Sequence, residues 1–141
     1  MKIIKSVYKH ILNSMPVSPP EIGGILGSIA DVVCKYQIDT GLPKGCGCFY
    51  SPNVCFLNNT INDWQQEEII FQGIFHTHFF GVQTLSDGDV AYITSIMQAM
   101  PECISKLYFP IVVLPEKEMI SYLAIRSGNA VEIKKDGLII V

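Results

Sequence analysis

The segment FQGIFHTHFFGVQTLSDGDVAYI, residues 71–93, decides the fold and carries two of the three histidines of the chain. Its first part is apolar and predicts a buried strand over residues 74–79. In that strand His76 and His78 point to the same side, because strand side chains alternate. Asp89 follows near the first turn of the next predicted helix. Two imidazoles and one carboxylate can hold a metal ion and leave a fourth tetrahedral position open, as a catalytic zinc site requires.

Each part of this segment also has a purely structural interpretation. The residues SDGD at 86–89 match a capping box, with Ser86 as the N-cap and Asp89 at the third helical position. An isolated His-x-His pair on an apolar strand more often packs in a core than binds a metal. Both patterns in one window are much less expected by chance, so the combination favours a metal site.

The composition is that of a single folded domain, spanning residues 1–141. With 49% hydrophobic and 16% charged residues, the chain can bury a core of its own. The formal net charge of −3 includes no basic excess, so a nucleic-acid partner has no electrostatic support. No apolar run approaches the length of a membrane span, which is about 18 residues or more. The first residues also lack the apolar stretch of a secretory leader. We therefore expect a cytoplasmic protein without a membrane partner, whose five cysteines are reduced.

Hydrophobic periodicity predicts helices and strands in a mixed order. An amphipathic helix is expected over residues 4–15, followed by two strands that turn near Ala30 and Asp31. Residues 41–53, rich in glycine, proline and cysteine, predict a loop. The remaining predictions, in chain order, are a short strand over 55–57, a short helix over 61–70, the histidine strand over 74–79, a helix over 90–100 that ends before Pro101, and closing strands within 107–141.

The histidine segment resembles a known enzyme family. The sequence HTH at 76–78, followed by seven residues, a serine, two residues and an aspartate, matches the signature H-[S/T]-H-x7-S-x2-D. This is the signature of JAMM metallopeptidases, the catalytic members of the JAB1/MPN superfamily. That family also has a glutamate on an early strand, and the stretch PPEIGGILG places Glu21 just before a glycine pair that suits a close contact. The resemblance implies an α/β, cytidine-deaminase-like MPN fold, a curved mixed β-sheet flanked by helices.

The resemblance also implies a role for each residue of the motif. His76, His78 and Asp89 would bind Zn²⁺. Glu21 would be the general base that takes a proton from the attacking water and passes it to the leaving amine. Ser86 would donate a hydrogen bond to the developing oxyanion. Because the capping box and the metal site use the same two side chains of Ser86 and Asp89, we expect the capping box to be partly surrendered.

The chain departs from many relatives beside the metal ligands. Where these relatives have proline after the second histidine and before the serine, this chain has Phe79 and Leu85. Together with Phe80 and Val82, these residues predict an apolar rim around the site. The departure bears on the choice of substrate more than on the chemistry.

The resemblance implies a zinc-dependent, deubiquitinase-like isopeptidase. The bond cleaved would follow the C-terminal glycine tail of a ubiquitin-like protein. One alternative is a processing peptidase for a sulfur-carrier protein or its amino-acid adduct. A second is a non-catalytic MPN scaffold, which the complete ligand set disfavours. A third is a cell-wall or phage-type peptidase, which the missing export signal disfavours.

The cysteines offer a weaker signal for a second zinc site. Cys46 and Cys48 are one residue apart, and Cys55 follows them. Three thiolates without a recognisable fourth ligand are weak support for a structural zinc. A reduced, glycine-spaced loop is the favoured interpretation.

Overall fold

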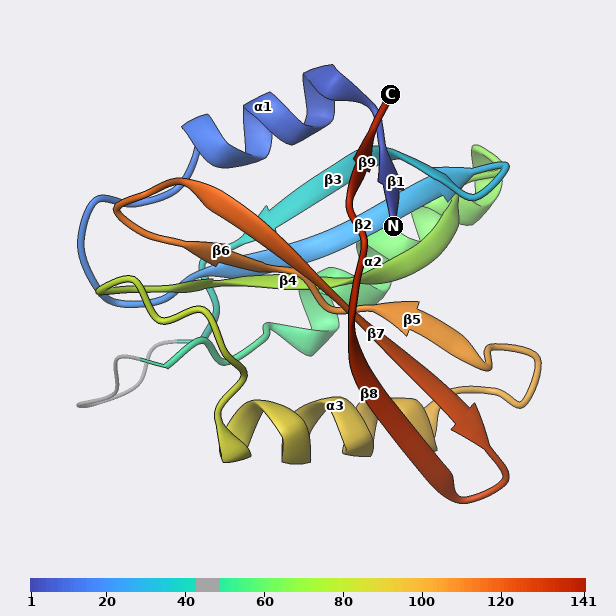
Figure 1. Ribbon diagram of the computed structural model, residues 1–141. Coiled ribbons are helices and arrows are strands. Elements are labelled where there is room, and N and C mark those ends of the chain that lie inside the picture. Colours follow the sequence, from blue (N-terminus) through green and yellow to red (C-terminus); the bar gives the residue numbers. More distant parts are fainter. Residues whose placement is uncertain (43–48) are drawn as a thin grey trace.

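The computed structural model describes residues 1–42 and 49–141, which fold around one mixed β-sheet (Figure 1). Cys46 and Cys48 of the suggested second zinc site lie outside the described residues. The elements are β1 (Lys2–Ile3), α1 (Lys5–Asn13), β2 (Gly23–Ile29), β3 (Val32–Asp39), α2 (Val54–Gln66), β4 (Ile70–His78), α3 (Asp87–Ala99), β5 (Lys106–Tyr108), β6 (Ile111–Val113), β7 (Glu118–Ser127), β8 (Ala130–Asp136) and β9 (Ile139–Ile140). None of the helices in the described ranges combines the length and the apolar character that crossing a membrane needs.

The sheet confirms the predicted mixed α/β architecture. Its strands follow the order β5-β7-β6-β4-β2-β3-β1-β9, with β8 paired to β7. The central strand β4 runs antiparallel to β2 but parallel to β5 and β6. The strand that carries the histidines therefore has neighbours on both edges, and its backbone is held along most of its length.

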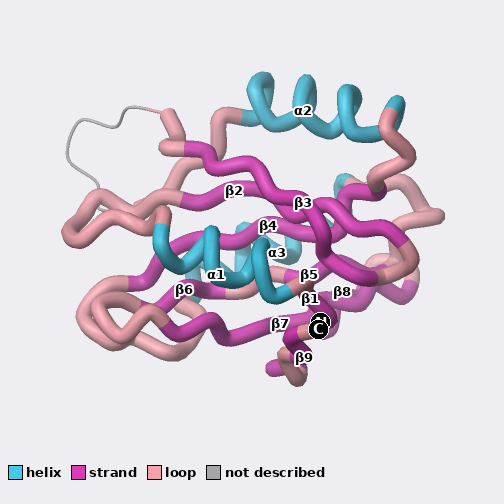
Figure 2. The backbone as a smooth tube through the Cα atoms, turned by 90° about the horizontal axis from the view of Figure 1, so that it is seen from above, coloured by secondary structure: helices cyan, strands magenta, loops and turns pink. Residues whose placement is uncertain are grey.

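Side-chain alternation along β4 determines which helix meets the histidines. Phe75 packs in a core cluster with α1, whereas Ile74 packs in a second cluster with α2 and α3. Figure 2 looks onto the face that carries α1, with α3 behind the sheet. His76 and His78 have the same parity as Ile74, so they project toward the α3 face. Asp89 in α3 can reach them for this reason.

The prediction for α2 was wrong at its start and at its end. Residues 55–57, expected as a strand, belong to the helix, and the expected helix over 61–70 already ends at Gln66. Asn53 caps the helix by accepting a hydrogen bond from the backbone N–H three residues later, at 3.2 Å. Leu57 and Trp64 then lie two turns apart on the buried side. Short apolar runs do not distinguish helix from strand until their packing partners are known.

Most other predicted elements are confirmed. Ala30 and Asp31 form the tight turn between β2 and β3 with positive φ angles of 49° and 61°, as a two-residue hairpin requires. The closing strands form as β5 to β9, and the predicted helix after the histidines begins three residues early, at Asp87. The sequence did not predict β1, which pairs in parallel with both β3 and β9.

Gly23 confirms that the glycine pair allows a close approach. A Cβ built at this position would lie 2.5 Å from the carbonyl oxygen of Phe75 and 2.5 Å from the ring of Tyr50. Both distances are far inside van der Waals contact. The absent side chain therefore lets the Tyr50 ring lie on β2 beside the metal-site strand.

We predict that Gly23→Ala lowers the stability of the fold. The added methyl group must displace backbone or an aromatic ring, which costs about 1–3 kcal/mol. Thermal melting measures the effect. Gly137→Ala is the matched control, because a Cβ there meets nothing within 4 Å. Equal melting temperatures for the two variants would show that the close contact at Gly23 does not affect the stability of the fold.

Candidate metal centre

Three side chains meet where the end of β4 approaches the start of α3. The Nε2 atoms of His76 and His78 are 2.9 Å apart. Asp89 Oδ1 lies 3.2 Å from Nε2 of His76, and Asp89 Oδ2 lies 3.2 Å from Nε2 of His78. The two imidazoles are buried, and the carboxylate is partly exposed. The structure thus brings together the three residues that the sequence predicted as metal ligands, in a group that could hold a metal ion.

The geometry of this cluster fits a tetrahedral metal ion. Ligand atoms placed about 2.0–2.1 Å from zinc are separated from one another by roughly 3.3 Å. The observed separations of 2.9 and 3.2 Å are close to this value. Imidazole nitrogen with carboxylate oxygen is a donor set that suits zinc and neighbouring first-row cations. The three residues can therefore hold a divalent metal ion with small adjustments.

A backbone carbonyl orients His78 toward this position. Nδ1 of His78 lies 3.2 Å from the carbonyl oxygen of Val82. A carbonyl can only accept, so Nδ1 carries a proton, and in the neutral ring Nε2 keeps its lone pair for a metal ion. Metal-binding histidines usually have such a partner on the other ring nitrogen, because it holds the ring and raises its basicity. The loop between β4 and α3 thus fixes the orientation of the His78 ring.

The expectation that the capping box would be partly surrendered is wrong. Ser86 Oγ accepts a hydrogen bond from the backbone N–H of Asp89 at 3.1 Å, and Asp89 Oδ2 accepts from the backbone N–H of Ser86 at 2.8 Å. The carboxylate keeps this bond while its two oxygens face the two histidines. One carboxylate can do both because each oxygen has two lone pairs. The cap therefore supports the ligand instead of competing with it.

Charges in the cluster favour a cation. Burial raises the pKa of the Asp89 carboxyl, but hydrogen bonds from His76 and His78 outweigh burial and hold that pKa well below its usual value. Burial lowers the pKa of the His78 imidazole, but its hydrogen bond to Asp89 and the charge of Asp89 raise it above the ordinary 6.5. Asp89 stays ionised and attracts positive charge, whether a proton on His78 or a metal ion.

Glu21 lies beside the cluster because Thr77 holds the chain just before β2. The Thr77 backbone N–H donates to the carbonyl of Ile22 at 2.9 Å, and Thr77 Oγ1 accepts from the Ile22 backbone N–H at 3.0 Å. Glu21 Oε2 in turn accepts a weak hydrogen bond from the backbone N–H of Tyr50 at 3.4 Å. Burial raises the pKa of Glu21 above 4.5, against the opposing charge of His76.

Asp39 is a site residue that the sequence analysis did not identify. Its side chain is only 4% exposed. Its oxygens accept hydrogen bonds from the Tyr50 hydroxyl at 2.8 Å, from the Asn53 backbone N–H at 2.8 Å and from the Gly41 backbone N–H at 2.9 Å. Asp39 therefore anchors the segment that supplies the backbone donor to Glu21. An isolated aspartate at a strand end gave no sequence signal for this role.

Two clefts of about 460 and 410 Å³ open beside the three ligands. Glu21, Phe49, Ser86 and Asp89 line both of them, whereas His76 and Tyr92 line only the larger cleft. All five residues predicted from the sequence thus line one or both of these adjoining clefts, with His76 in the larger cleft and His78 in the smaller. An extended polypeptide bound across Asp89 could therefore occupy both clefts at once.

The four residues of the predicted apolar rim all line the smaller cleft. Phe80 is the most exposed of them, at 86%. Phe79 is only 8% exposed, because it also packs in the core on the α1 side.

We predict that the protein binds about one zinc ion per chain at this centre. His76→Ala should remove the metal and lower the melting temperature, because metal-binding energy is also folding energy. His10→Ala is the control, since His10 is exposed on α1 and should keep the metal. Elemental analysis after zinc reconstitution and dialysis measures the number of zinc ions per chain. Metal-free protein, or equal content in the two variants, would contradict the prediction.

The same centre should make zinc affinity depend on pH. The protonated His78–Asp89 pair stabilises the metal-free fold below pH 6.5, and this contribution is lost as pH rises through the raised pKa of His78. Zinc needs the deprotonated ring, so its stabilising effect grows over the same range. Melting temperatures with and without zinc should therefore diverge as pH rises through neutrality. Parallel curves would exclude His78 as a ligand.

No family model and no curated protein matches the sequence. The fold is similar to that of solved structures over nearly the whole chain. A JAB1/MPN domain protein from Archaeoglobus fulgidus aligns with a TM-score of 0.60 and 21% identity, covering 100% of this chain and 99% of that one. Protein DSY2949 from Desulfitobacterium hafniense aligns with a TM-score of 0.66 and 17% identity, covering 99% of this chain and 92% of that one. These likenesses confirm the architecture predicted from the histidine segment: the chain has the JAB1/MPN fold.

Proposed function

We propose that the protein is a zinc metallopeptidase that hydrolyses a peptide or isopeptide bond. The observation that carries this proposal is the arrangement around the three ligand atoms. Nε2 of His76, Nε2 of His78 and the Asp89 carboxylate converge, and the adjoining clefts are lined by a partly buried carboxylate, Glu21, and a hydroxyl, Ser86. These are the groups that metal-assisted hydrolysis needs besides the ligands.

Zinc bound by the three ligands would lower the pKa of a water molecule and polarise the carbonyl of the substrate. Glu21 then serves as the general base. Its Oε2 is held by the Tyr50 backbone N–H, and among the described residues Oε1 has no hydrogen-bond partner, so Oε1 can accept the proton of the water. Its pKa, raised by burial, lies closer to neutral pH than that of an exposed glutamate. A base with such a pKa can also return the proton to the leaving amine.

Ser86 can cap the helix and act on the substrate at the same time. The cap uses a lone pair of Oγ, which accepts from the Asp89 backbone N–H at 3.1 Å. A hydroxyl has one hydrogen to donate besides its lone pairs. That hydrogen can point into either cleft, where it would stabilise the oxyanion that develops on the carbonyl oxygen.

The proposed substrate is a ubiquitin-like or sulfur-carrier protein with a C-terminal glycine tail. The exposed ring of Phe80 stands at the edge of the smaller cleft at the ligands, and Val82 and Leu85 also line that cleft. Glycines next to the cleaved bond avoid clashes with these walls. The sulfur-carrier alternative uses the same chemistry, since both kinds of protein present an extended glycine tail. The proposed reaction takes place after the last glycine.

The test of this proposal is cleavage of an intact modifier. Ubiquitin-like and sulfur-carrier proteins, each fused at the C-terminal glycine to a short extension, should be cut after that glycine by the zinc-loaded protein. Glu21→Gln should keep zinc and reduce the rate about 10²–10⁴-fold, because the base is lost. Mass spectrometry maps the cut. Cleavage away from glycine, or equal rates for the intact fusion and its tail peptide, would defeat the substrate assignment.

Ser86 variants can separate capping from catalysis. Ser86→Ala should lose turnover about 10²–10³-fold and destabilise the fold by about 1 kcal/mol. Ser86→Gly should lose as much turnover but only a few tenths of a kcal/mol of stability, because glycine is tolerated at an N-cap. Turnover and melting are measured on zinc-loaded protein. A glycine variant with normal turnover would assign Ser86 to the helix alone.

A further inference from the structure

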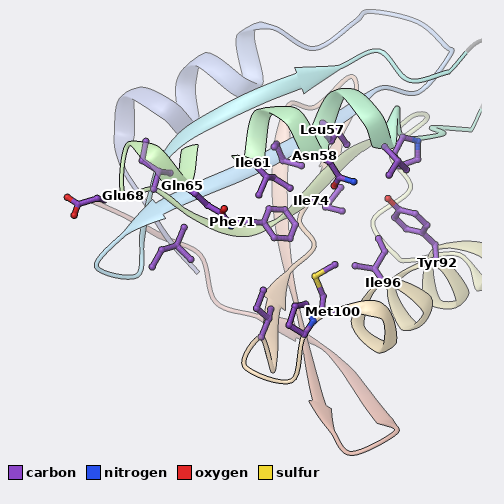
Figure 3. A pocket seen from close by; sticks show the side chains of 17 residues that line it. Leu57, Asn58, Ile61, Gln65, Glu68, Phe71, Ile74, Tyr92, Ile96 and Met100 are labelled. Atoms are coloured by element: carbon purple, nitrogen blue, oxygen red, sulfur yellow. The ribbon is translucent and has the colours of Figure 1, made fainter. Parts of the chain in front are cut away.

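A larger cavity lies between α2 and α3 on the face of the sheet that carries the histidines. Its volume is about 650 Å³. Figure 3 shows side chains from both helices and from β4 directed into it. Its walls are mainly aliphatic and aromatic, and they include Ile25, Ile61, Phe71, Ile74, Ile96 and Met100. This size is typical of cavities that bind ligands.

The polarity of the walls restricts the ligand. The polar side chains that line the cavity include Asn58, Gln65 and Glu68, and among the described residues no lysine or arginine lines it. A phosphate or carboxylate headgroup would therefore find no cation. Val54 and Ile70, which also line the cavity, are 62% and 64% exposed. Such exposure leaves apolar surface available to a ligand that is neutral and aliphatic.

The cavity adjoins the metal centre through one residue. Tyr92 in α3 lines both this cavity and the cleft that contains His76 and Asp89. Pro52, from the segment that Asp39 anchors, also lines the cavity. The two spaces thus share a wall, and an extended chain held at the metal centre can place side chains in both.

We propose that this cavity is a substrate subsite, which takes aliphatic side chains that the substrate protein carries on one side of the cleaved bond. The proposal rests on the proposed function. Glycines at the cleaved bond bring no side chain to the clefts at the metal, so they contribute little binding energy. Each aliphatic side chain buried in the cavity raises affinity about ten- to hundredfold. Binding energy from such a remote contact can be used to accelerate the reaction.

The position and size of the cavity favour the substrate over a second copy of the chain. A volume of about 650 Å³ holds a few side chains and not a folded element. A second copy seated on the mouth would also lie against the cleft through Tyr92 and obstruct it. A substrate occupies both spaces in the same event, which is the arrangement that the shared wall allows.

Two neighbouring asparagines of α2 provide a matched test. Both asparagines are exposed, but only Asn58 lines the cavity. Asn58→Trp should fill the cavity and lower kcat/KM for the intact fusion about tenfold or more, with zinc content and melting temperature unchanged. Asn59→Trp should leave all three measurements unchanged. Equal kcat/KM for the two variants, at equal melting temperatures, would overturn the proposal.

A binding assay separates this proposal from the proposed function. The neutral fluorophore N-phenyl-1-naphthylamine should bind the wild type and Asn59→Trp but not Asn58→Trp, and the uncleaved fusion should displace it. If the wild type cleaves no fusion while this displacement occurs, the proposed function fails and the subsite stands. If the fusion does not displace the probe, the subsite fails. A dimer that Asn58→Trp converts to a monomer in sedimentation would assign the cavity to self-association and also overturn it.

Discussion

The antiparallel pairing of β2 with β4 is the constraint on which the metal centre depends. Gly23 pairs with His76 in this register, and three hydrogen bonds join Thr77 to Ile22 just beyond it. The proposed general base therefore lies beside the histidines although Glu21 and His76 are 55 positions apart in the chain. A shift by one residue would turn the histidines toward α1 and away from Asp89. The register is secured because both faces of β4 are buried by different helices.

The second constraint is electrostatic and is local to the start of α3. Asp89 is a helix-capping residue and a candidate metal ligand in one side chain, since its Oδ2 accepts from the Ser86 backbone N–H while both oxygens face the histidines. The cap prevents the carboxylate from rotating away into solvent. In return, the imidazoles compensate a charge that burial disfavours. Stability of the helix start and preorganisation of the ligand are thus produced by the same hydrogen bonds.

The segment around Tyr50 connects the metal centre to the apolar cavity. The buried carboxylate of Asp39 anchors it through the Tyr50 hydroxyl and the Asn53 backbone. On one side the segment donates to Glu21, and on the other Pro52 forms part of the wall of the cavity. The segment therefore joins the proposed base to the proposed subsite.

The sequence alone determined the elements whose signals are local. The His-x-His spacing defines one strand face, the SDGD capping box marks a helix start, and Ala30–Asp31 marks a hairpin, because these patterns depend on neighbours within a few residues. Only the tertiary structure decided the extent of α2, the burial of Phe79, the anchoring role of Asp39 and the cavity bounded by Tyr92. Each of these depends on contacts between segments far apart in the chain. Such contacts leave no periodic or short-range pattern from which a single sequence could reveal them.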